Sequence, residues 1–369
     1  MQLAQLKLGD FRNIETAEIR PHHYFNIFCG ANAQGKTNLL ESLYILGSLK
    51  SFRSSRNEEL IRHGHERSSI KGIARQNRVE HEIRVDISFE GKQAKLDGKL
   101  VKQPETYLNC LRPVVFAPEE VSLTKGPPAG RRKMLDRAVF QTETNFLEDA
   151  RKYDRQLRQR NRLLKLGRNE REIEPWSEEL IRTGARIRYA RSQYLQRLVP
   201  RIAECYREIC GETERVELFY KEQKNDIQQL EKSIRQDFDR QRDQEKKYGM
   251  TLSGPHRDDF DFLIDGRPLK SFGSQGQQRS FVLAFKAAQT LDLQHVHGEP
   301  PLLLLDDLTG ELDQQRQELF YRFLLSMQTQ VFITTTDVRP LLDGGINDGY
   351  FFRVENGSFH ADSISKRCE

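Results

Sequence analysis

Residues 30–37 are the segment whose residue types and spacing most clearly predict chemistry. They read GANAQGKT and fit G-x-x-x-x-G-K-[ST], the pattern of a phosphate-binding loop. Glycines let the backbone curl so that successive N–H groups point at an anion, and Lys36 can reach the β- and γ-phosphates of a nucleotide. Thr37 offers a hydroxyl to Mg²⁺. The predicted nucleotide-binding residues are Gly30, Ala31, Asn32, Ala33, Gln34, Gly35, Lys36, Thr37 and Asn38.

The sequence on either side of this loop fits the structural setting that the motif requires. Residues 24–29 form a short apolar run of β-prone residues, and residues 38–46 have the apolar spacing of a helix. A phosphate-binding loop needs a strand, a loop and a helix in this order. The context therefore favours a nucleotide site over a glycine-rich turn that binds nothing.

A second apolar run ends in two carboxylates. Residues 301–305 read PLLLL, and Asp306 and Asp307 follow directly. A fully apolar strand is buried on both faces and presents its last side chains at the edge of the sheet where the phosphate-binding loop also opens. We therefore expect Asp306 to hold Mg²⁺ and Asp307 to orient or deprotonate the attacking water. The chain has no N-K-x-D motif for guanine, so the predicted nucleotide is ATP.

The composition predicts a folded cytoplasmic protein with more than one lobe. A chain of 369 residues exceeds what one core usually holds, and 31% of its residues are charged. No apolar run is long enough to cross a membrane, and the N-terminus lacks the apolar core of a signal peptide, so no membrane contact is expected. The five cysteines form no C-x-x-C pair, and the histidine pairs His63/His65 and His295/His297 have no cysteine or third ligand nearby in sequence, which argues against a zinc site or a disulfide framework.

Positive charge is concentrated in the middle of the chain. The net charge of the whole chain is +5, but residues 151–250 contain 25 Lys and Arg against 18 Asp and Glu. Two interpretations of this surplus remain open, a surface that binds a polyanion and an ordinary solvated helix surface.

The apolar pattern divides the chain into three segments. Residues 1–125 contain mainly strand patterns around the phosphate-binding loop, and residues 249–369 return to alternating strands and helices. Residues 126–248 have apolar residues at steps of three and four, which predicts helices in a short antiparallel arm. Within it, Pro175 is expected at a helix start and Pro200 is expected to kink the second helix.

A short glutamine-rich segment links the two halves of the predicted site. Residues 274–279, SQGQQR, resemble the signature motif of ABC-type ATPases, in which a serine and a glycine at a helix N-terminus meet the γ-phosphate. Glu311-Leu312-Asp313, shortly after the two aspartates, resembles the D-loop of the same proteins. The combination of loop, signature and acidic strand end is much more specific than any one of them.

Several further segments carry a resemblance to the RecF family, within the class of SMC-like ABC ATPases. It implies an α/β fold, with an ABC-ATPase-type head made of a mixed β lobe and a P-loop core, and an inserted, mainly helical lobe. The segments are LKLGDFRNIETAEI at 6–19, GANAQGKTNLLESLYIL at 30–46, KSFRS at 50–54, VVFAPEEVSLTKGPPAGRRKMLD at 114–136, SGPHRDDF at 253–260, SQGQQRS at 274–280 and DDLTGELD at 306–313.

The resemblance implies an ATP-driven homodimer in which each nucleotide is held by both chains. Lys36 and Asp307 would be catalytic in a weak, DNA-stimulated ATPase, and Thr37 and Asp306 would bind Mg²⁺. Two departures from the family pattern stand out, Ala33 in place of a loop glycine and Thr309-Gly310 before the D-loop. The residues expected to act on the partner's nucleotide or at the dimer seam are Ser274, Gln275, Gly276, Gln277 and Asp313.

The function implied by the resemblance is the binding of gapped, junction or single-stranded DNA in recombinational repair and replication-fork recovery. Such a protein assists the loading of RecA together with RecO and RecR, with roles in replication and in the SOS response. Two alternatives from other classes share the same motifs, an ATPase subunit of a transporter and a non-catalytic scaffold whose dimer is held by ATP. The charged insertion and the lack of a switch histidine argue against the transporter.

Overall fold

The computed structural model describes residues 1–76, 79–143, 145–211, 214–307 and 313–362. Internal contacts divide the chain into two compact units. We call the first unit the head; it comprises residues 1–121, 205–212 and 279–369. The second unit, residues 122–204 and 213–278, is the arm. No helix in the described part of the chain is both long enough and apolar enough to span a membrane.

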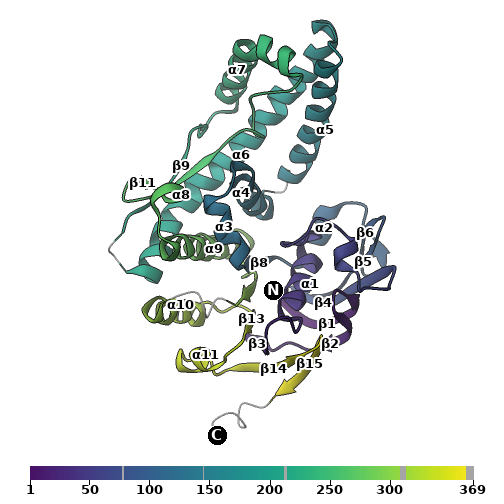
Figure 1. The fold of residues 1–369 in the computed structure, drawn as a ribbon, viewed down its shortest axis with the longest axis vertical. Coiled ribbons are helices and arrows are strands. Elements are labelled where there is room, and N and C mark those ends of the chain that lie inside the picture. Colours follow the sequence, from purple (N-terminus) through teal and green to yellow (C-terminus); the bar gives the residue numbers. More distant parts are fainter. Residues whose placement is uncertain (77–78, 144, 212–213, 308–312, 363–369) are drawn as a thin grey trace. The chain divides into compact units, whose positions relative to one another are not determined.

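The first sheet of the head is antiparallel, with strand order β2-β1-β4-β5-β6-β7 (Figure 1). A turn at Asp97-Gly98, a residue pair that favours tight hairpin turns, joins its last two strands, with both residues at positive φ, 49° and 76°. The strands are β1 (Gln2–Phe11), β2 (Ile14–Ile19), β4 (Arg67–Gln76), β5 (Val79–Ser88), β6 (Gly91–Leu96) and β7 (Lys99–Leu100).

The second sheet of the head has the order β15-β14-β3-β13-β12-β8, and only β15 is antiparallel to its neighbour. Every residue of β12 and β13 is buried, as expected for central strands of a parallel sheet, and the edge strand β8 is buried as well. The strands are β3 (Phe25–Cys29), β8 (Pro113–Phe116), β12 (Leu302–Asp306), β13 (Val331–Thr335), β14 (Gly349–Glu355) and β15 (Ser358–Asp362). The carboxyl ends of β3, β13 and β12 therefore lie side by side.

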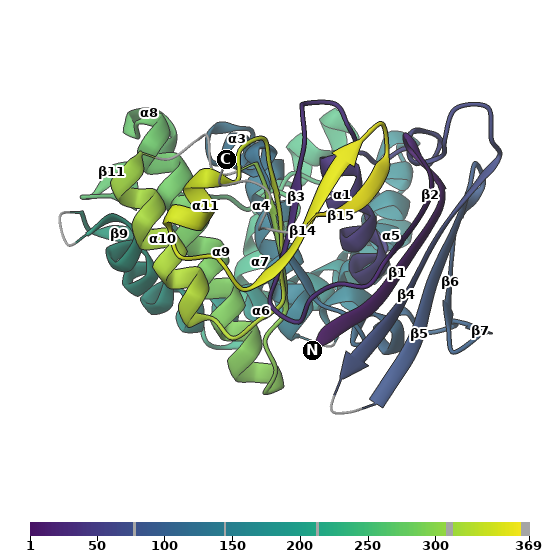
Figure 2. The same ribbon diagram turned by 90° about the horizontal axis from the view of Figure 1, so that it is seen from below.

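Helix α1 (Lys36–Ser48) packs between the two sheets of the head, as Figure 2 shows. Two glycines make this close packing possible. A Cβ atom on Gly47 would lie 2.4 Å from Cδ of Pro113, and one on Gly72 would lie 2.7 Å from Cδ2 of Leu46. The other helices of the head are η1 (Glu58–Leu60), α2 (Pro104–Leu108), α10 (Gln314–Ser326) and α11 (Arg339–Asp343).

The arm is mainly helical and contains a small antiparallel sheet of order β11-β10-β9. Three helices, α3, α6 and α9, have residues in both units. The arm elements are α4 (Pro128–Thr142), α5 (Phe146–Lys165), α7 (Ile227–Tyr248), α8 (Leu269–Phe272), β9 (Val216–Tyr220), β10 (Phe260–Ile264) and β11 (Arg267–Pro268), and the three shared helices are α3 (Pro118–Lys125), α6 (Glu170–Cys210) and α9 (Gln275–His297).

The core of the arm contains ion pairs as well as apolar side chains. The carboxylate of Asp258 is buried and accepts hydrogen bonds from Arg188 at 2.7 Å, Arg191 at 3.1 Å and the hydroxyl of Tyr220 at 2.6 Å. A buried carboxylate is tolerated only when its charge and hydrogen-bonding capacity are matched in this way. Part of the basic surplus in the sequence therefore lies inside the arm and cannot form a binding surface.

Two sequence-based expectations for the arm differ from the structure. Helix α6 already begins at Glu170, so Pro175 lies inside the helix and the prediction that it starts one is wrong. Residues 249–278, predicted to begin the second head segment, group with the arm because β10 pairs with β9. Their alternating apolar pattern correctly predicts a strand, but a local pattern does not identify the partner strand.

Candidate nucleotide-binding site

The loop at residues 30–35 connects β3 to α1 and has the backbone conformation of an anion-binding turn. Gly35 has φ of 111° and Ala33 has φ of 65°, so both lie in the left-handed region. For Ala33 this conformation costs about 1 kcal/mol relative to glycine, because its Cβ approaches the following carbonyl. The alanine that departs from the family pattern thus adopts the conformation that a glycine would adopt more easily.

Lys36 begins helix α1 and its side chain turns back over the loop. Its Nζ donates to the carbonyl oxygen of Gly30 at 2.6 Å and to that of Ala31 at 2.8 Å. Burial lowers the pKa of Lys36 below its ordinary value, and the negative charges of Asp307 and Asp306 act in the opposite direction. The lysine is thus held next to the concave side of the loop, close to both aspartates at the end of β12.

The two predicted Mg²⁺ ligands come together although they are far apart in the sequence. The Thr37 hydroxyl donates to Oδ1 of Asp306 at 2.9 Å, and the Thr334 hydroxyl donates to the same oxygen at 2.7 Å. The carboxylate and the Thr37 hydroxyl are hard oxygen donors of the kind that Mg²⁺ prefers. These residues therefore fit a Mg²⁺ site between the phosphate-binding loop and the end of β12.

Asp307 follows β12 directly and has a positive φ of 48°. Its backbone N–H donates to the carbonyl oxygen of Thr334 at 3.2 Å and to the hydroxyl of the same residue at 3.1 Å. Strand β13 ends next to Asp307. Just after β13, both carboxylate oxygens of Asp337 accept hydrogen bonds from the guanidinium of Arg339. The contacts with Thr334 hold Asp307 at the carboxyl end of the parallel sheet, next to Asp306.

A second layer of polar contacts holds the loop in place. The carbonyl oxygen of Gln34 accepts from the N–H of Gly357 at 2.8 Å and from Nδ2 of Asn13 at 3.2 Å, while its Oε1 accepts from the N–H of Asn356 at 2.7 Å. Asn38 donates to Oδ1 of Asn13 at 2.8 Å. Sequence analysis missed this layer. The Asn-Gly pair does predict a hairpin turn between β14 and β15, but not its contact with the loop.

Helix α1 also carries a fully buried carboxylate, Glu41. Arg12 donates to both of its oxygens, at 2.9 Å each, and the Ser51 hydroxyl donates to one of them. Arg53 lies 3.8 Å from the same carboxylate and donates to the side chain of Asn38 at 2.9 Å. These contacts place two guanidinium groups beside the first turns of α1, and sequence analysis named neither arginine as a site residue.

The predicted signature residues cap the N-terminus of α9. The N–H of Gln277 donates to the Ser274 hydroxyl at 3.1 Å, and the N–H of Ser274 donates to Oε1 of Gln277 at 2.8 Å. This reciprocal pair is a capping box, which fixes the start of a helix. Gln275 and Gly276 form the first turn. All four residues belong to the arm, whereas the loop at 30–37 belongs to the head.

Only the last residue of the predicted D-loop lies in the described part of the chain. Asp313 caps helix α10, because its carboxylate accepts from the N–H of Arg316 at 3.0 Å. Glu311, Leu312 and the departure at Thr309-Gly310 fall outside the described residues. The expected place of Asp313 at a dimer seam stays a prediction.

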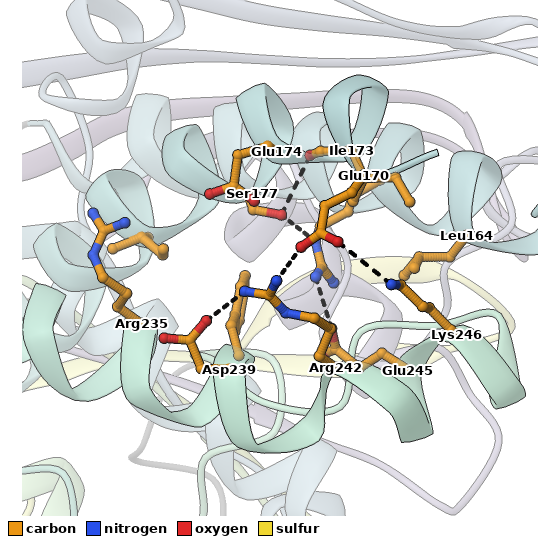
Figure 3. Close-up of a pocket in the computed structure, with 13 residues that line it drawn as sticks. Leu164, Glu170, Ile173, Glu174, Ser177, Arg235, Asp239, Arg242, Glu245 and Lys246 are labelled. Carbon is orange, nitrogen blue, oxygen red and sulfur yellow. Dashed lines mark hydrogen bonds and ion pairs between the residues drawn. The ribbon is translucent and has the colours of Figure 1, made fainter. Parts of the chain in front are cut away.

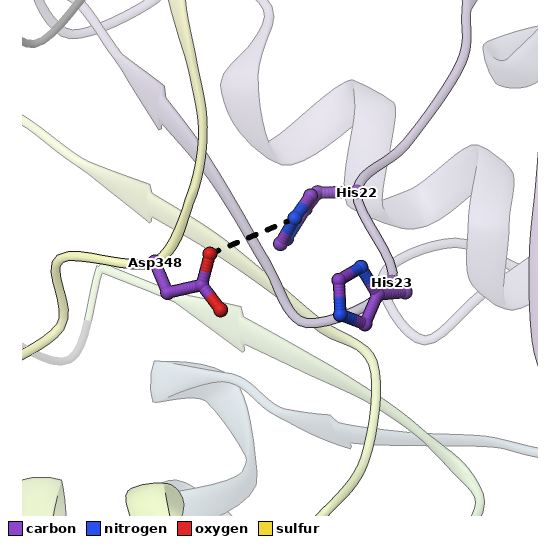
Figure 4. Close-up of side chains that lie close together, drawn as sticks. All are labelled: His22, His23 and Asp348. Atoms are coloured by element: carbon purple, nitrogen blue, oxygen red, sulfur yellow. Dashed lines mark ion pairs between the residues drawn. The ribbon is translucent and has the colours of Figure 1, made fainter.

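A cluster of His22, His23 and Asp348 lies at the opposite edge of the parallel sheet, near the amino ends of β3 and β14 (Figure 4). Nδ1 of His22 accepts from the N–H of Tyr24 at 3.3 Å, so its proton is on Nε2, which lies 3.7 Å from Asp348. A metal ligand needs a lone pair at that nitrogen. The geometry therefore fits an imidazole–carboxylate pair and not a metal site.

A small pocket of about 130 Å³ in the arm is lined by residues of α5, α6 and α7 (Figure 3). Its charged groups pair with one another, as in Arg160 with Glu245 at 2.7 Å and Lys246 with Glu170 at 3.6 Å. Pockets that bind small molecules usually enclose roughly 300–1,000 Å³. This pocket is therefore too small to be a nucleotide site.

Known proteins are similar to this chain over nearly its whole length. Residues 2–349 match the family model described as the RecF/RecN/SMC N terminal domain. The DNA replication and repair protein RecF of Syntrophotalea carbinolica is 49% identical over 357 residues, which cover 97% of this chain and 98% of that protein. RecF of Geotalea uraniireducens is 42% identical over 361 residues, with 97% and 99% covered.

Solved structures confirm the predicted fold class. The recombination mediator protein RecF in complex with ATP, described as part of the RecFOR pathway, matches with a TM-score of 0.88 at 30% identity, covering 98% of this chain and 99% of that one. An Smc head bound to the C-winged helix domain of ScpA has a TM-score of 0.57 at 15% identity, which is a likeness of fold alone. The α/β head with an inserted helical lobe is thus an architecture shared with these proteins.

Proposed function

The chain belongs to the RecF/RecN/SMC family, and from this premise we propose that it is an ATP-dependent DNA-binding protein of replication and recombinational repair. The observation that carries the proposal is the meeting of Thr37 and Asp306 at 2.9 Å, which joins the phosphate-binding loop to the acidic strand end. Relatives up to 49% identical, named as DNA replication and repair proteins, favour this role over that of a transporter subunit.

The proposed reaction is hydrolysis of ATP to ADP and phosphate. The N–H groups of the loop and of the first turn of α1 bind the phosphates, because a helix N-terminus attracts anions. Lys36 exchanges its contacts with the carbonyls of Gly30 and Ala31 for phosphate oxygens. Thr37 and Asp306 would hold Mg²⁺, which screens the phosphate charge when bound. Asp307 orients the attacking water and accepts its proton.

The proposed dimer completes each site with a second copy of the chain. The capping box formed by Ser274 and Gln277 fixes the N-terminus of α9, where backbone N–H groups and the helix dipole favour a phosphate. These residues, with Gln275 and Gly276, would approach the γ-phosphate bound to the other protomer. Asp313, at the N-terminus of α10, would lie at the seam. ATP binding would then favour the dimer and hydrolysis would release it.

The proposed biological role is the marking of gapped, junction or single-stranded DNA for repair and replication-fork recovery. In this role the protein would work with RecO and RecR to place RecA, with effects on the SOS response. The solved RecF structures, described as belonging to the RecFOR pathway, support these partners. We propose a slow, DNA-stimulated ATPase. Because ATP binding would favour the dimer that binds DNA, slow hydrolysis would keep the dimer on DNA for longer.

The test measures the mass of the full-length protein, its affinity for gapped DNA and its ATP turnover, each with and without ATP. We expect wild type to dimerise and bind DNA with ATP, and Lys36→Ala to do neither because it loses a phosphate ligand. Asp307→Asn keeps ATP binding but loses the proton acceptor, so it still dimerises while turnover falls about 100-fold. Lys99→Ala, which removes the same charge at an exposed position of β7, is the matched control.

Two outcomes would contradict this proposal in different ways. Equal ATP turnover of wild type and Asp307→Asn would favour the non-catalytic scaffold over the ATPase. Equal DNA affinity of wild type and Lys36→Ala at moderate salt would show that ATP does not control DNA binding.

A further inference from the structure

Helix α5 of the arm has two opposite faces of different chemistry. Its buried side chains are Phe146, Tyr153, Gln156, Arg160 and Leu164. At about 100° per residue, these fall within an arc of about 80° around the helix axis. The centre of the opposite arc, also about 80° wide, is occupied by exposed basic residues at steps of four and three. This basic stripe consists of Arg151, Arg155, Arg158, Arg162 and Lys165.

The surroundings of the basic stripe leave it with a net positive charge. The acidic residues of α5 are Glu148, Asp149 and Asp154. Asp149 pairs with Arg186 of α6 at 2.8 Å, and Asp154 pairs with Arg158 of the stripe. Within the stripe, Asp154 thus offsets the charge of Arg158, and α5 as a whole keeps more basic than acidic residues.

The other charged helix of the arm, α7, differs in this respect. It contains six Lys and Arg against five Asp and Glu, and its basic and acidic residues alternate along the helix. Helix α5 contains seven basic residues against three acidic ones. Since Arg160, Arg188 and Arg191 are buried in ion pairs, the exposed part of the basic surplus is concentrated on α5.

We propose that the basic stripe of α5 binds the phosphate backbone of DNA; this inference rests on the DNA-binding function proposed above. From Arg151 to Lys165 the stripe extends about 21 Å, at 1.5 Å per residue. One DNA strand presents about six phosphates over that length, at 3.4 Å each. Five long, flexible cationic side chains can therefore each reach a phosphate, in contacts that do not depend on base sequence.

The same geometry disfavours a membrane surface as the partner. A helix that binds membranes through its surface needs an apolar face next to its basic one. The apolar face of α5, which includes Phe146, Tyr153 and Leu164, is buried within the arm. The exposed face of α5 is cationic, with no apolar face beside it, and therefore fits a polyanion and not a lipid bilayer.

The test compares two triple variants of the full-length protein with equal changes in net charge. The stripe variant is Arg155→Gln, Arg162→Gln and Lys165→Gln, and the control variant is Lys232→Gln, Arg240→Gln and Lys247→Gln on exposed positions of α7. Affinity for duplex and single-stranded DNA is measured with ATP at several salt concentrations. Each phosphate contact contributes about 0.9 to the slope of log affinity against log salt.

We expect the stripe variant to lose a slope of about 3 and, at 0.15 M salt, affinity on the order of 100-fold. The control variant stays within about threefold of wild type, and ATP turnover without DNA is unchanged in both. A larger loss on duplex or on single-stranded DNA tells which form lies along α5.

Three results would overturn the inference. If wild type binds DNA and the stripe variant has the same affinity and the same salt slope, α5 does not contact DNA, and the proposed function still holds. Equal losses in both variants would mean that only the total charge matters. If stripe-dependent binding occurs to vesicles of anionic lipid but not to DNA, the partner is wrong. Failure of wild type to bind DNA in any nucleotide state would instead refute the proposed function itself.

Discussion

The arm contains a half-buried histidine, His256, whose protonation we predict to destabilise the arm as the pH falls. The hydroxyl of Tyr153 lies 2.8 Å from Nδ1, and the carbonyl oxygen of Thr251 lies 3.2 Å from Nε2. Since a carbonyl only accepts, Nε2 carries a proton, and in the neutral ring Nδ1 then accepts from the tyrosine hydroxyl. Burial lowers the pKa of His256 to about 4, and the positive charge of Arg257 acts in the same direction.

The magnitude follows from the difference between the folded and unfolded pKa values. The ordinary histidine value is 6.5, so between pH 6.5 and 4 the unfolded chain binds a proton that the folded chain does not. The free energy of unfolding therefore falls as the pH is lowered through this window. Proton linkage with the two pKa values gives a loss of about 2 kcal/mol between pH 7.5 and 5, and about 3 kcal/mol below pH 4.

Urea unfolding at pH 7.5 and 5.0 measures this loss in the arm alone, because the single tryptophan of the chain, Trp176, lies in α6 and reports arm unfolding by fluorescence. His256→Gln keeps a donor and an acceptor but does not titrate. We expect wild type to lose about 2 kcal/mol more than this variant. His63→Gln, at an exposed histidine of the head, is the control and leaves the wild-type loss unchanged. Losses in wild type and His256→Gln that agree within about 0.5 kcal/mol would refute the assignment of a neutral His256 with a lowered pKa.

Two further predictions concern the head. Gln34→Ala removes the acceptor for the N–H of Asn356 and loosens the phosphate-binding loop, so we expect KM for ATP to rise about fivefold with little change in kcat. Steady-state kinetics measure both constants. An unchanged KM would mean that the turn between β14 and β15 does not position the loop. Gly47→Ala places a Cβ 2.4 Å from Cδ of Pro113 and destabilises the head by about 1–3 kcal/mol in thermal unfolding. Gly91→Ala, where an added Cβ meets nothing within 4 Å, leaves stability nearly unchanged, and equal effects of the two changes would contradict the packing argument.

Much of the fold can be predicted because burial and turn chemistry leave local traces in the sequence. The all-apolar run at 302–305 becomes a central strand, and Asp97-Gly98 becomes a hairpin turn with two positive φ angles. The partner of a strand leaves no such trace. Strand β10 was expected in the head but pairs with β9 of the arm, and Pro175 was expected at a helix start but lies inside α6.

In the candidate site, too, contacts between distant parts of the chain could be predicted only in part. The proximity of Thr37 and Asp306 can be predicted because both follow strands whose carboxyl ends share one edge of a parallel sheet. The contacts of Gln34 with the β14–β15 turn join residues more than 300 positions apart, and no local pattern indicates them. Charge counting also cannot tell a buried arginine such as Arg188 from an exposed one such as Arg155, since both only add to the total.

The order of strands in the parallel sheet has a consequence for how the protein is made. Strand β3, which carries the phosphate-binding loop, pairs with β13 and β14, both encoded some 300 residues later. At about 5–20 residues per second, the ribosome takes roughly 15–60 s to supply these partners. The arm, whose residues all lie between 122 and 278, can fold during that interval. The nascent chain therefore holds an unpaired, apolar strand edge until late in synthesis, which makes β3 a candidate binding segment for chaperones.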